Sequence, residues 1–371
     1  MRADAPIPAL DPTPSPGPPA LFHALWLLTF LLHLLFVNAV LGGALLGAVA
    51  SWAGSAQRRT ALFFAELNSW AISLAITFGI APLLFLQVLH GRFFYTATIL
   101  VAWGWLSMVA ILTVAYYLNY AVKARLRAGR DAPVLYTLEA LLLLAVAAIQ
   151  VAVHLLTVQP GRWGEVSRQA WSALSDPSFV PRALHFVLAA VSMAGVLLAR
   201  QMAKRSSAGE DADLLRPAAS FGVKAALLAT LLQLVDGFWL LLSLPQGVLK
   251  GLMRGGAGTM VPLTLGVVAG LALLVLLSQV RDPFADAKKV RHALELLLGA
   301  VILMTVTRHQ VRGITLAFSG AQGEPAVAPQ WGAFALFAGS LVLCAGLTAF
   351  AVVRSVKDRP GPGSGPGNEA A

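Results

Sequence analysis

Long apolar segments alternate with short polar connections along most of the chain. A helix that crosses the hydrocarbon of a membrane needs about 20 consecutive, mostly apolar residues. Nine segments meet this requirement, at residues 21–52, 68–90, 97–122, 134–157, 181–203, 217–243, 257–280, 290–310 and 331–354. The pattern therefore predicts an all-α fold, a polytopic membrane helix bundle of about nine transmembrane helices.

Composition agrees with this class of protein. Hydrophobic residues make up 58% of the chain and charged residues 12%, whereas soluble domains carry about 25% charged residues. The single cysteine, Cys344, excludes an internal disulfide, and without a Cys-x-x-Cys-His sequence the chain attaches no c-type haem covalently. We expect one transmembrane domain at 21–355, a disordered Pro-rich tail at 1–20 rather than a cleavable signal peptide, and a disordered tail at 356–371.

Basic residues are concentrated in alternate connections. Lysine and arginine gather after the first, third, fifth, seventh and ninth segments, as in "KARLRAGR" at 123–130. Connections rich in lysine and arginine lie in the cytoplasm, which places the N-terminus outside and the C-terminus in the cytoplasm. The same rule explains the formal net charge of +10. We therefore expect membrane lipid, and no nucleic acid, as a partner.

Six of the seven histidines lie toward the predicted outer face. His33 lies in the outer half of the first segment, and His185 lies about one turn into the fifth. The other four are near the outer ends of segments: His23, His90, His154 and His309. Histidine is the usual ligand of haem iron, and a methionine thioether can occupy the opposite axial position. Met260 lies at the depth of His185, so the pattern favours a haem between them, with His33 at a second haem or at a site shared with the outer histidines.

Each of these residues also has an interpretation without a cofactor. An intramembrane histidine such as His33 can simply hydrogen-bond a neighbouring helix. A histidine near the lipid headgroups is well solvated, and a methionine such as Met260 more often fills space between helices. The gathering of histidines on one face favours the cofactor interpretation, because polar side chains at membrane depth tend to mark functional sites.

Three further charged residues are candidates for the site. Asp236 lies within the sixth segment, toward its outer part, where it would neutralise a cation, carry a proton or accept a hydrogen bond from a quinol. Arg308 and Arg312 are four residues apart, on one face of a helix at the outer boundary. They would bind the propionates of a haem in a bidentate manner or, alternatively, lipid headgroups.

Two other features carry expectations about local structure. Glu139, near the cytoplasmic end of the fourth segment, is expected to be solvated. In the longest outer loop, 158–180, the apolar residues Trp163, Val166 and Trp171 predict a short helix that lies in the membrane interface.

Two stretches resemble subunit I of the cytochrome bd quinol oxidases. The stretch "LHLLFVNAVLG" (32–42) is similar to that family's first helix, with His33 at the histidine that ligates an active-site haem. The stretch "LHFVLAAVSMAG" (184–195) resembles its fifth helix, with His185 at the haem b histidine.

The resemblance extends over most of the membrane part. The stretch "TMVPLTLGVVAG" (259–270) resembles the helix with the methionine ligand, which is Met260 here, and "FGIAPLLFLQVLHGRFFY" (78–95) is similar to the second helix. The resemblance implies one or more haem b groups as cofactor, quinone or quinol as substrate, and a location in the bacterial inner (plasma) membrane.

The chain departs from that family at three places. Its third segment, "TILVAWGWLSMVAILTVAYYLNY", has no acidic residue where the family has acids for protons and haem. Only a short loop separates the sixth and seventh segments, where the family has a long quinol loop. The stretch "TRHQVRG" (307–313) stands where the family has a Glu-rich helix end. The similarity is therefore closer to the divergent bd-like cytochromes found beside multihaem c-type cytochromes.

On these grounds the sequence predicts a membrane cytochrome b that moves electrons between the quinone pool and a periplasmic redox partner. The electrons would pass through haem near the outer face, within a respiratory complex. Periplasmic c-type cytochromes or other subunits of that complex are the expected partners. Two alternatives stay open: a quinol-oxidising terminal oxidase subunit that reduces dioxygen, and a haem-free membrane anchor or transporter.

Overall fold

The computed structural model describes residues 7–9, 14–320 and 326–357. Within these ranges the chain is helical, apart from connections and one isolated β-bridge between Ser15 and Val327. Nine helices in the described ranges are long and apolar enough to cross a membrane. The prediction of an all-α membrane bundle with about nine spans is confirmed.

The long helices follow the predicted segments closely. They are α1 (Pro19–Trp52), α2 (Arg58–Leu100), α3 (Ala102–Arg127), α4 (Pro133–Val158), α6 (Phe179–Ser207), α7 (Ala212–Ser243), α9 (Ala257–Ser278), α10 (Ala287–Phe318) and α11 (Trp331–Lys357). Two shorter helices are α5 (Trp163–Val166) and α8 (Gln246–Arg254), and three 3-10 turns cover Gly54–Gln57, Pro160–Arg162 and Ala170–Leu174.

The second helix departs most from its predicted bounds. α2 begins ten residues before residue 68 and runs on to Leu100, with a kink at His90, whose φ and ψ of −137° and 27° are not helical. The residues after the kink stay helical because Phe93 and Phe94 bury their rings against the bundle, at 3% exposure each. Residues 91–96, which the sequence predicts as a polar connection, are therefore helical and packed against the bundle.

The chain divides into two compact units. The first comprises Met1–Asp11 with Phe22–Glu324, and the second comprises Pro12–Leu21 with Pro325–Ala371, including α11. The expected single domain at 21–355 stays a prediction. Of the predicted tails, residues 1–6, 10–13 and 358–371 lie outside the described residues.

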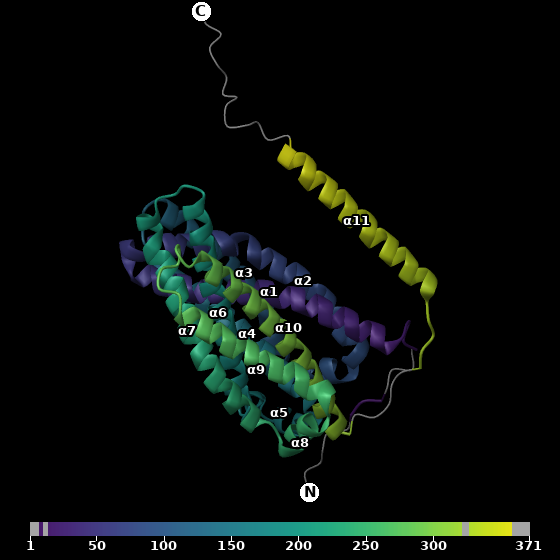
Figure 1. The fold of residues 1–371 in the computed structure, drawn as a ribbon. Coiled ribbons are helices and arrows are strands. Elements are labelled where there is room, and N and C mark those ends of the chain that lie inside the picture. The colour runs from purple at the N-terminus through teal and green to yellow at the C-terminus, as the bar shows by residue number, and fades with distance from the viewer. Residues whose placement is uncertain (1–6, 10–13, 321–325, 358–371) are drawn as a thin grey trace, which may run out of the picture. The chain divides into compact units, whose positions relative to one another are not determined.

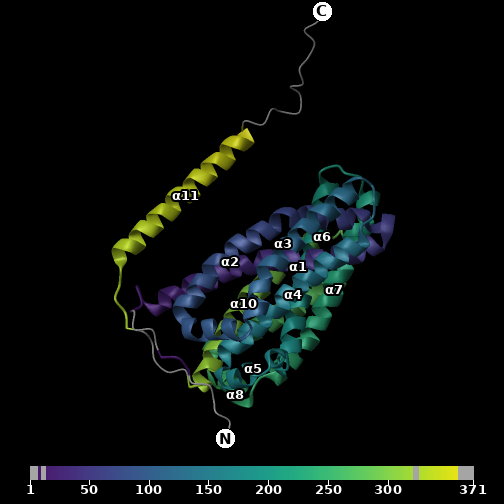
Figure 2. The ribbon, with the colours of Figure 1, turned by 180° about the vertical axis from the view of Figure 1, so that it is seen from behind.

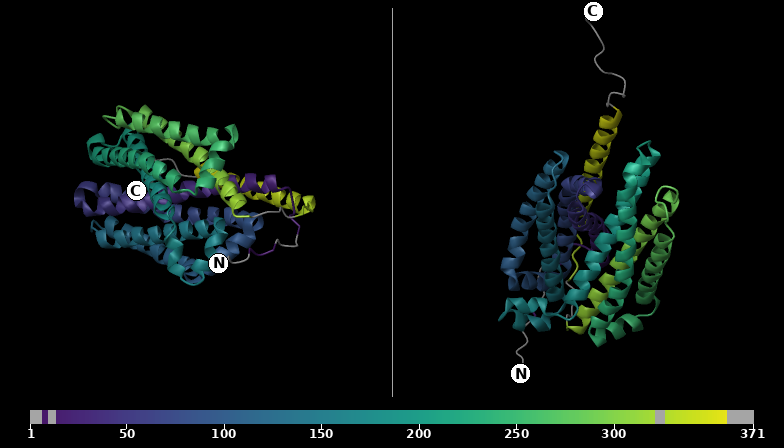
Figure 3. Two further views of the ribbon diagram at one scale, coloured as in Figure 1. Left: turned by 90° about the horizontal axis from the view of Figure 1, so that it is seen from below. Right: turned by 90° about the vertical axis from the view of Figure 1, so that its left-hand side faces the viewer.

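Helices of the first unit pack side by side along most of their length (Figure 1). Figure 2 shows α2, α3 and α4 from behind, and the right-hand view of Figure 3 shows them on one side of α1 and α6, with α7 and α9 on the other side. α6 packs most extensively on α7. These two helices cross where Gly195 meets Gly222, since a Cβ at Gly195 would lie 2.6 Å from the Gly222 carbonyl oxygen.

The two ends of this bundle differ in their polar groups. We call the end at which His23, His90, His154 and His309 lie the histidine end; the short helices α5 and α8 lie at this same end (Figures 1 and 2). At the opposite end, ion pairs join the connections, as between Arg216 Nη1 and Asp282 Oδ2 at 2.7 Å. The hydrogen bond from Arg216 holds the pKa of Asp282 below its usual range.

The glycine contact between α6 and α7 gives a test of the packing. We expect Gly195→Ala to lower stability by about 1–3 kcal/mol, because the new methyl group meets a backbone oxygen that cannot move aside. The control is Gly299→Ala in α10, where a Cβ would have no atom within 4 Å. Thermal unfolding of the purified protein in detergent measures both. Equal midpoints for the two variants would contradict this packing.

Candidate functional site

A cavity of about 290 Å³ lies inside the first unit, between α1, α6, α7, α9 and α10. Its wall is mainly leucine, valine, phenylalanine and glycine. The polar residues in the wall are Asn38, Arg182, His185, Thr230, Gln233, Thr305, Thr307 and Arg308. No aspartate or glutamate is among the described lining residues. An apolar chamber with one histidine and two arginines suits a large, mostly apolar ligand with acidic groups at one edge.

The imidazole ring of His185 is hydrogen-bonded to a carboxylate. Its Nδ1 lies 3.1 Å from Oδ2 of Asp236, a side chain that is only 3% exposed. Since a carboxylate only accepts, Nδ1 donates to it, and Nε2 acts as an acceptor. Nε2 accepts from the side-chain amide nitrogen of Gln233 at 3.4 Å, and both residues line the cavity.

Three arginines lie next to this cavity, of which Arg182 and Arg308 are half-buried and Arg312 is buried. Arg182 and Arg308 line it, and Arg312 lies one turn beyond Arg308 on α10, at 4% exposure. Arg308 and Arg312 stack over the rings of Phe30 and Trp26, at 4.7 and 4.5 Å from the ring centres. Throughout the described ranges, no salt bridge to a carboxylate is formed by any of the three arginines.

Polar atoms of these arginines are left without partners. Nε of Arg182 and both Nε and Nη1 of Arg312 are buried and make no hydrogen bond to any described residue. Burying an unpaired cation is costly, whereas the planar guanidinium forms strong bidentate hydrogen bonds with carboxylates. The residues therefore fit a ligand that brings its own carboxylates, as the two propionates of a haem would.

The end histidines form a second polar cluster. The rings of His23 and His309 are 5.0 Å apart, and those of His23 and His90 are 6.0 Å apart. Arg312 donates from Nη2 to Nδ1 of His154, at 3.1 Å. In the ranges that the structure describes, no three histidine, cysteine, aspartate or glutamate side chains are arranged to hold a metal ion. The roles of His90, His154 and His309 stay predictions.

His33 lies apart from the cavity of His185. Its Nδ1 donates to the Ala75 carbonyl oxygen of α2 at 2.8 Å, and its ring fits against Gly79, where a Cβ would lie 2.9 Å from Cε1. Leu34 and Asn38 of the same helix do line the cavity. A hydrogen bond to a neighbouring helix is expected of a histidine that only stabilises helix packing. The same bond leaves Nε2 free, as in histidines that ligate a metal through that atom.

Two methionines lie near the cavity. Met260 is half-buried in the first turn of α9 and is not among the lining residues, although Leu263, three residues later on the same helical face, is. Met304 of α10 does line the cavity, with its Cε 2.6 Å from the position of a Cβ at Gly266. The assignment of Met260 as the second axial ligand stays a prediction, and Met304 is the thioether that the structure places in the cavity wall.

Several residues of the interior were missed by sequence reasoning. Arg182 lies within the predicted fifth segment but is not among the predicted site residues, although it lies three residues before His185 and thus on the same helical face. Glu139 was expected to be solvated, and this is wrong. It is fully buried.

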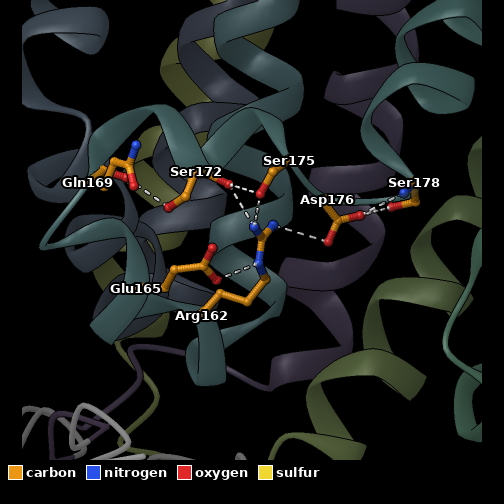
Figure 4. Close-up of polar contacts among 7 residues, drawn as sticks. All are labelled: Arg162, Glu165, Gln169, Ser172, Ser175, Asp176 and Ser178. Carbon is orange, nitrogen blue, oxygen red and sulfur yellow. Dashed lines mark hydrogen bonds and ion pairs between the residues drawn. The ribbon is translucent and has the colours of Figure 1, made fainter.

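The loop before α6 determines how the first turn of that helix is held. Arg162 donates from Nη1 to Asp176 Oδ2 at 3.2 Å and from Nη2 to the Ser172 carbonyl oxygen at 2.6 Å, and its Nε lies 3.8 Å from Glu165 (Figure 4). Asp176 in turn accepts from the backbone N–H of Ser178 at 2.8 Å. This network holds the start of α6, and therefore Arg182 and His185, in place.

The prediction of one interfacial helix in this loop is wrong. The loop contains the one-turn helix α5 and two 3-10 turns, Pro160–Arg162 and Ala170–Leu174. Trp163 is 1% exposed and donates from Nε1 to the Leu156 carbonyl oxygen, whereas Trp171 is 78% exposed. The two tryptophans therefore do not share one apolar face.

Comparisons with known proteins establish the fold. No family model matches the sequence, and no curated protein matches it. Among solved structures, a chain of the bd oxidase from Geobacillus thermodenitrificans is similar to this chain, with a TM-score of 0.69 and 12% sequence identity. The similarity covers 94% of this chain and 100% of that chain. The protein is thus an integral membrane helix bundle. Its fold is that of a bd oxidase chain, which confirms the resemblance at the level of the fold.

The arginine network gives a test of how α6 is held. We expect Arg162→Met to lower stability by about 1–3 kcal/mol, because Asp176, at 8% exposure, loses its charged partner. The control is Arg168→Met in the same loop, where the side chain is exposed. Thermal unfolding in detergent compares the two variants. If Arg162→Met were no less stable than Arg168→Met, the network would not support α6.

Proposed function

We propose that this protein is a membrane cytochrome b that transfers electrons between quinol and a periplasmic redox partner, as part of a respiratory complex. One observation carries the proposal. His185 and Gln233 line an apolar cavity together with Arg182 and Arg308, and neither arginine forms a salt bridge to a carboxylate in the described part of the chain. A haem b matches both features, since it needs a nitrogen ligand for its iron and cations for its propionates.

In this proposal the residues in and near the cavity have distinct tasks. His185 would bind the iron through Nε2, and Met260, in the first turn of α9, would supply a thioether ligand. Arg182 and Arg308 hold the propionates, and Arg312 adds positive charge behind Arg308. The apolar wall excludes water. When bound, the haem supplies one-electron transfer, while the protein supplies ligands, orientation and electrostatics.

The charge of the connections suggests which side of the membrane the site faces. The basic connections lie at the end opposite to the histidine end, so we propose that the histidine end faces the periplasm and that the C-terminus lies in the cytoplasm. The protein would then reside in the bacterial plasma membrane. Quinol would give up electrons near the outer face, where c-type cytochromes or other subunits of the complex could accept them.

His33 and the end histidines belong to a second part of the proposal. His33 keeps Nε2 free while Nδ1 is bonded to Ala75, and His90 and His309 lie close to His23 at the histidine end. We propose a second haem near His33, through which electrons leave toward the periplasm. The end histidines, with His154 bonded to Arg312, would provide its polar surroundings.

The similarity to a bd oxidase favours one alternative, a terminal oxidase that reduces dioxygen. Oxygen uptake by the purified complex with a quinol donor separates the two. Our proposal expects no sustained uptake, because the third segment lacks acidic residues that would deliver protons. Sustained uptake that responds to cyanide would favour the oxidase instead.

The ligand role of His185 predicts the behaviour of one pair of variants. We expect His185→Ala to abolish the low-spin haem signal associated with the cavity, because the iron loses its nitrogen ligand. His292→Ala is the control, since His292 lies at the opposite end and pairs with Glu295 at 2.8 Å. Visible and electron paramagnetic resonance spectra of the purified variants measure the signal. A signal that survives His185→Ala unchanged would rule out this ligand.

The two methionines can be separated in the same way. We expect Met260→Leu to convert the six-coordinate low-spin haem to a form that binds carbon monoxide, because one axial position opens. Met304→Leu should leave the spectrum of the reduced haem as in the wild type. The opposite result, with the change on Met304→Leu alone, would assign the second ligand to the cavity-lining methionine of α10.

A further inference from the structure

The structure places Asp236 behind His185, away from the cavity. We propose that Asp236 is a positioning residue that fixes the tautomer and orientation of His185 and lowers the reduction potential of the haem that His185 binds. This inference rests on the proposed function, because it assumes that His185 is a haem ligand. It assigns to Asp236 a role different from contact with quinol or transfer of its protons.

The geometry supports an indirect role. Gln233 and Gly237, one residue or one turn away on α7, line the cavity, whereas Asp236 is not among the lining residues. Oδ2 of Asp236 lies 3.1 Å from Nδ1 of His185, on the side of the ring away from Nε2. A ligand in the cavity therefore meets the ring of His185 and the amide of Gln233, and Asp236 acts on it through the ring.

The surroundings of Asp236 keep this contact in one arrangement. The side chain is 3% exposed, and among the described residues Oδ1 makes no hydrogen bond that would draw the carboxylate elsewhere. Gly237 lies beside the ring, and a Cβ there would sit 3.5 Å from Cε1 of His185, so the ring is confined on that side too. The imidazole is held between α6 and α7, with Nδ1 at Asp236 and Nε2 at Gln233 of the cavity wall.

The chemistry of this pair determines the sign of the effect. Histidines that ligate a metal usually donate their other ring N–H to a carboxylate or a carbonyl, which fixes the tautomer and raises the basicity of the ligand. A more basic imidazole donates more electron density and stabilises the oxidised iron relative to the reduced iron. An amide in place of the carboxylate accepts a weaker hydrogen bond, because it carries no charge.

The test is a redox titration of the purified full-length protein and of Asp236→Asn, which has nearly the same size. We expect Asp236→Asn to shift the equilibrium of the low-spin haem toward the reduced form by about tenfold, which is a rise of about 59 mV for one electron. Asp236→Glu keeps a carboxylate and should recover most of the shift. Asp213→Asn is the matched control on the same helix, since its side chain is 91% exposed.

The outcomes are distinguishable from those of the proposed function. A wild-type protein without haem would refute the proposed function itself. A wild-type protein with haem, together with an Asp236→Asn variant of unchanged potential, would refute only the role of Asp236. A purely structural role would lower stability or haem content without moving the potential of the haem that remains, and that result would also overturn the inference.

If Asp236→Asn does not fold, a measurement on the wild-type protein tests the positioning role of Asp236. Redox-difference infrared spectra of protein with carboxyl-labelled aspartate report whether an aspartate carboxylate responds to haem oxidation. We expect a label-sensitive carboxylate band that changes with the redox state, because Asp236 is hydrogen-bonded to the ligand ring. The absence of any label-sensitive band would contradict the inference.

Discussion

Ionic side chains inside a membrane helix bundle need partners, because no water in the hydrocarbon can solvate them. This constraint explains the arrangement around the central cavity. Asp236 is hydrogen-bonded to His185, while Arg308 and Arg312 stack on aromatic rings. Arg182 and Arg312 keep buried nitrogen atoms that make no hydrogen bond to any described residue. A bundle built only for packing would gain nothing from such groups. Their presence around an apolar cavity is the reason for proposing an acidic, mostly apolar cofactor.

The same constraint separates the two histidines that the sequence places inside helices. His33 is bonded to a backbone carbonyl on α2, and His185 is bonded to a carboxylate on α7. Both bonds use Nδ1 and leave Nε2 available. A carbonyl is a neutral acceptor and a carboxylate is a charged one, so two haems bound at these histidines would differ in potential. A difference of this kind would give electron transfer through the bundle a direction.

Much of the fold could be predicted from the sequence, because length and hydrophobicity alone define a spanning helix. The histidine end could also be predicted, since depth follows from position within a span. Tertiary packing decided the rest. The helix continues past the kink at His90, where Phe93 and Phe94 are buried, and Glu139 is buried because α4 packs against α2 and α3 rather than facing water. Arg182 could have been found from the sequence by its spacing of three residues from His185.

The central claim is that the cavity of His185 holds a haem b. The most direct measurement is the reduced-minus-oxidised visible spectrum of the purified wild-type protein, combined with its haem content per chain. The account predicts the α-band of a low-spin haem b, with at least one non-covalently bound haem per chain. A purified, folded protein without an α-band would contradict it and would leave the buried arginines to another anion.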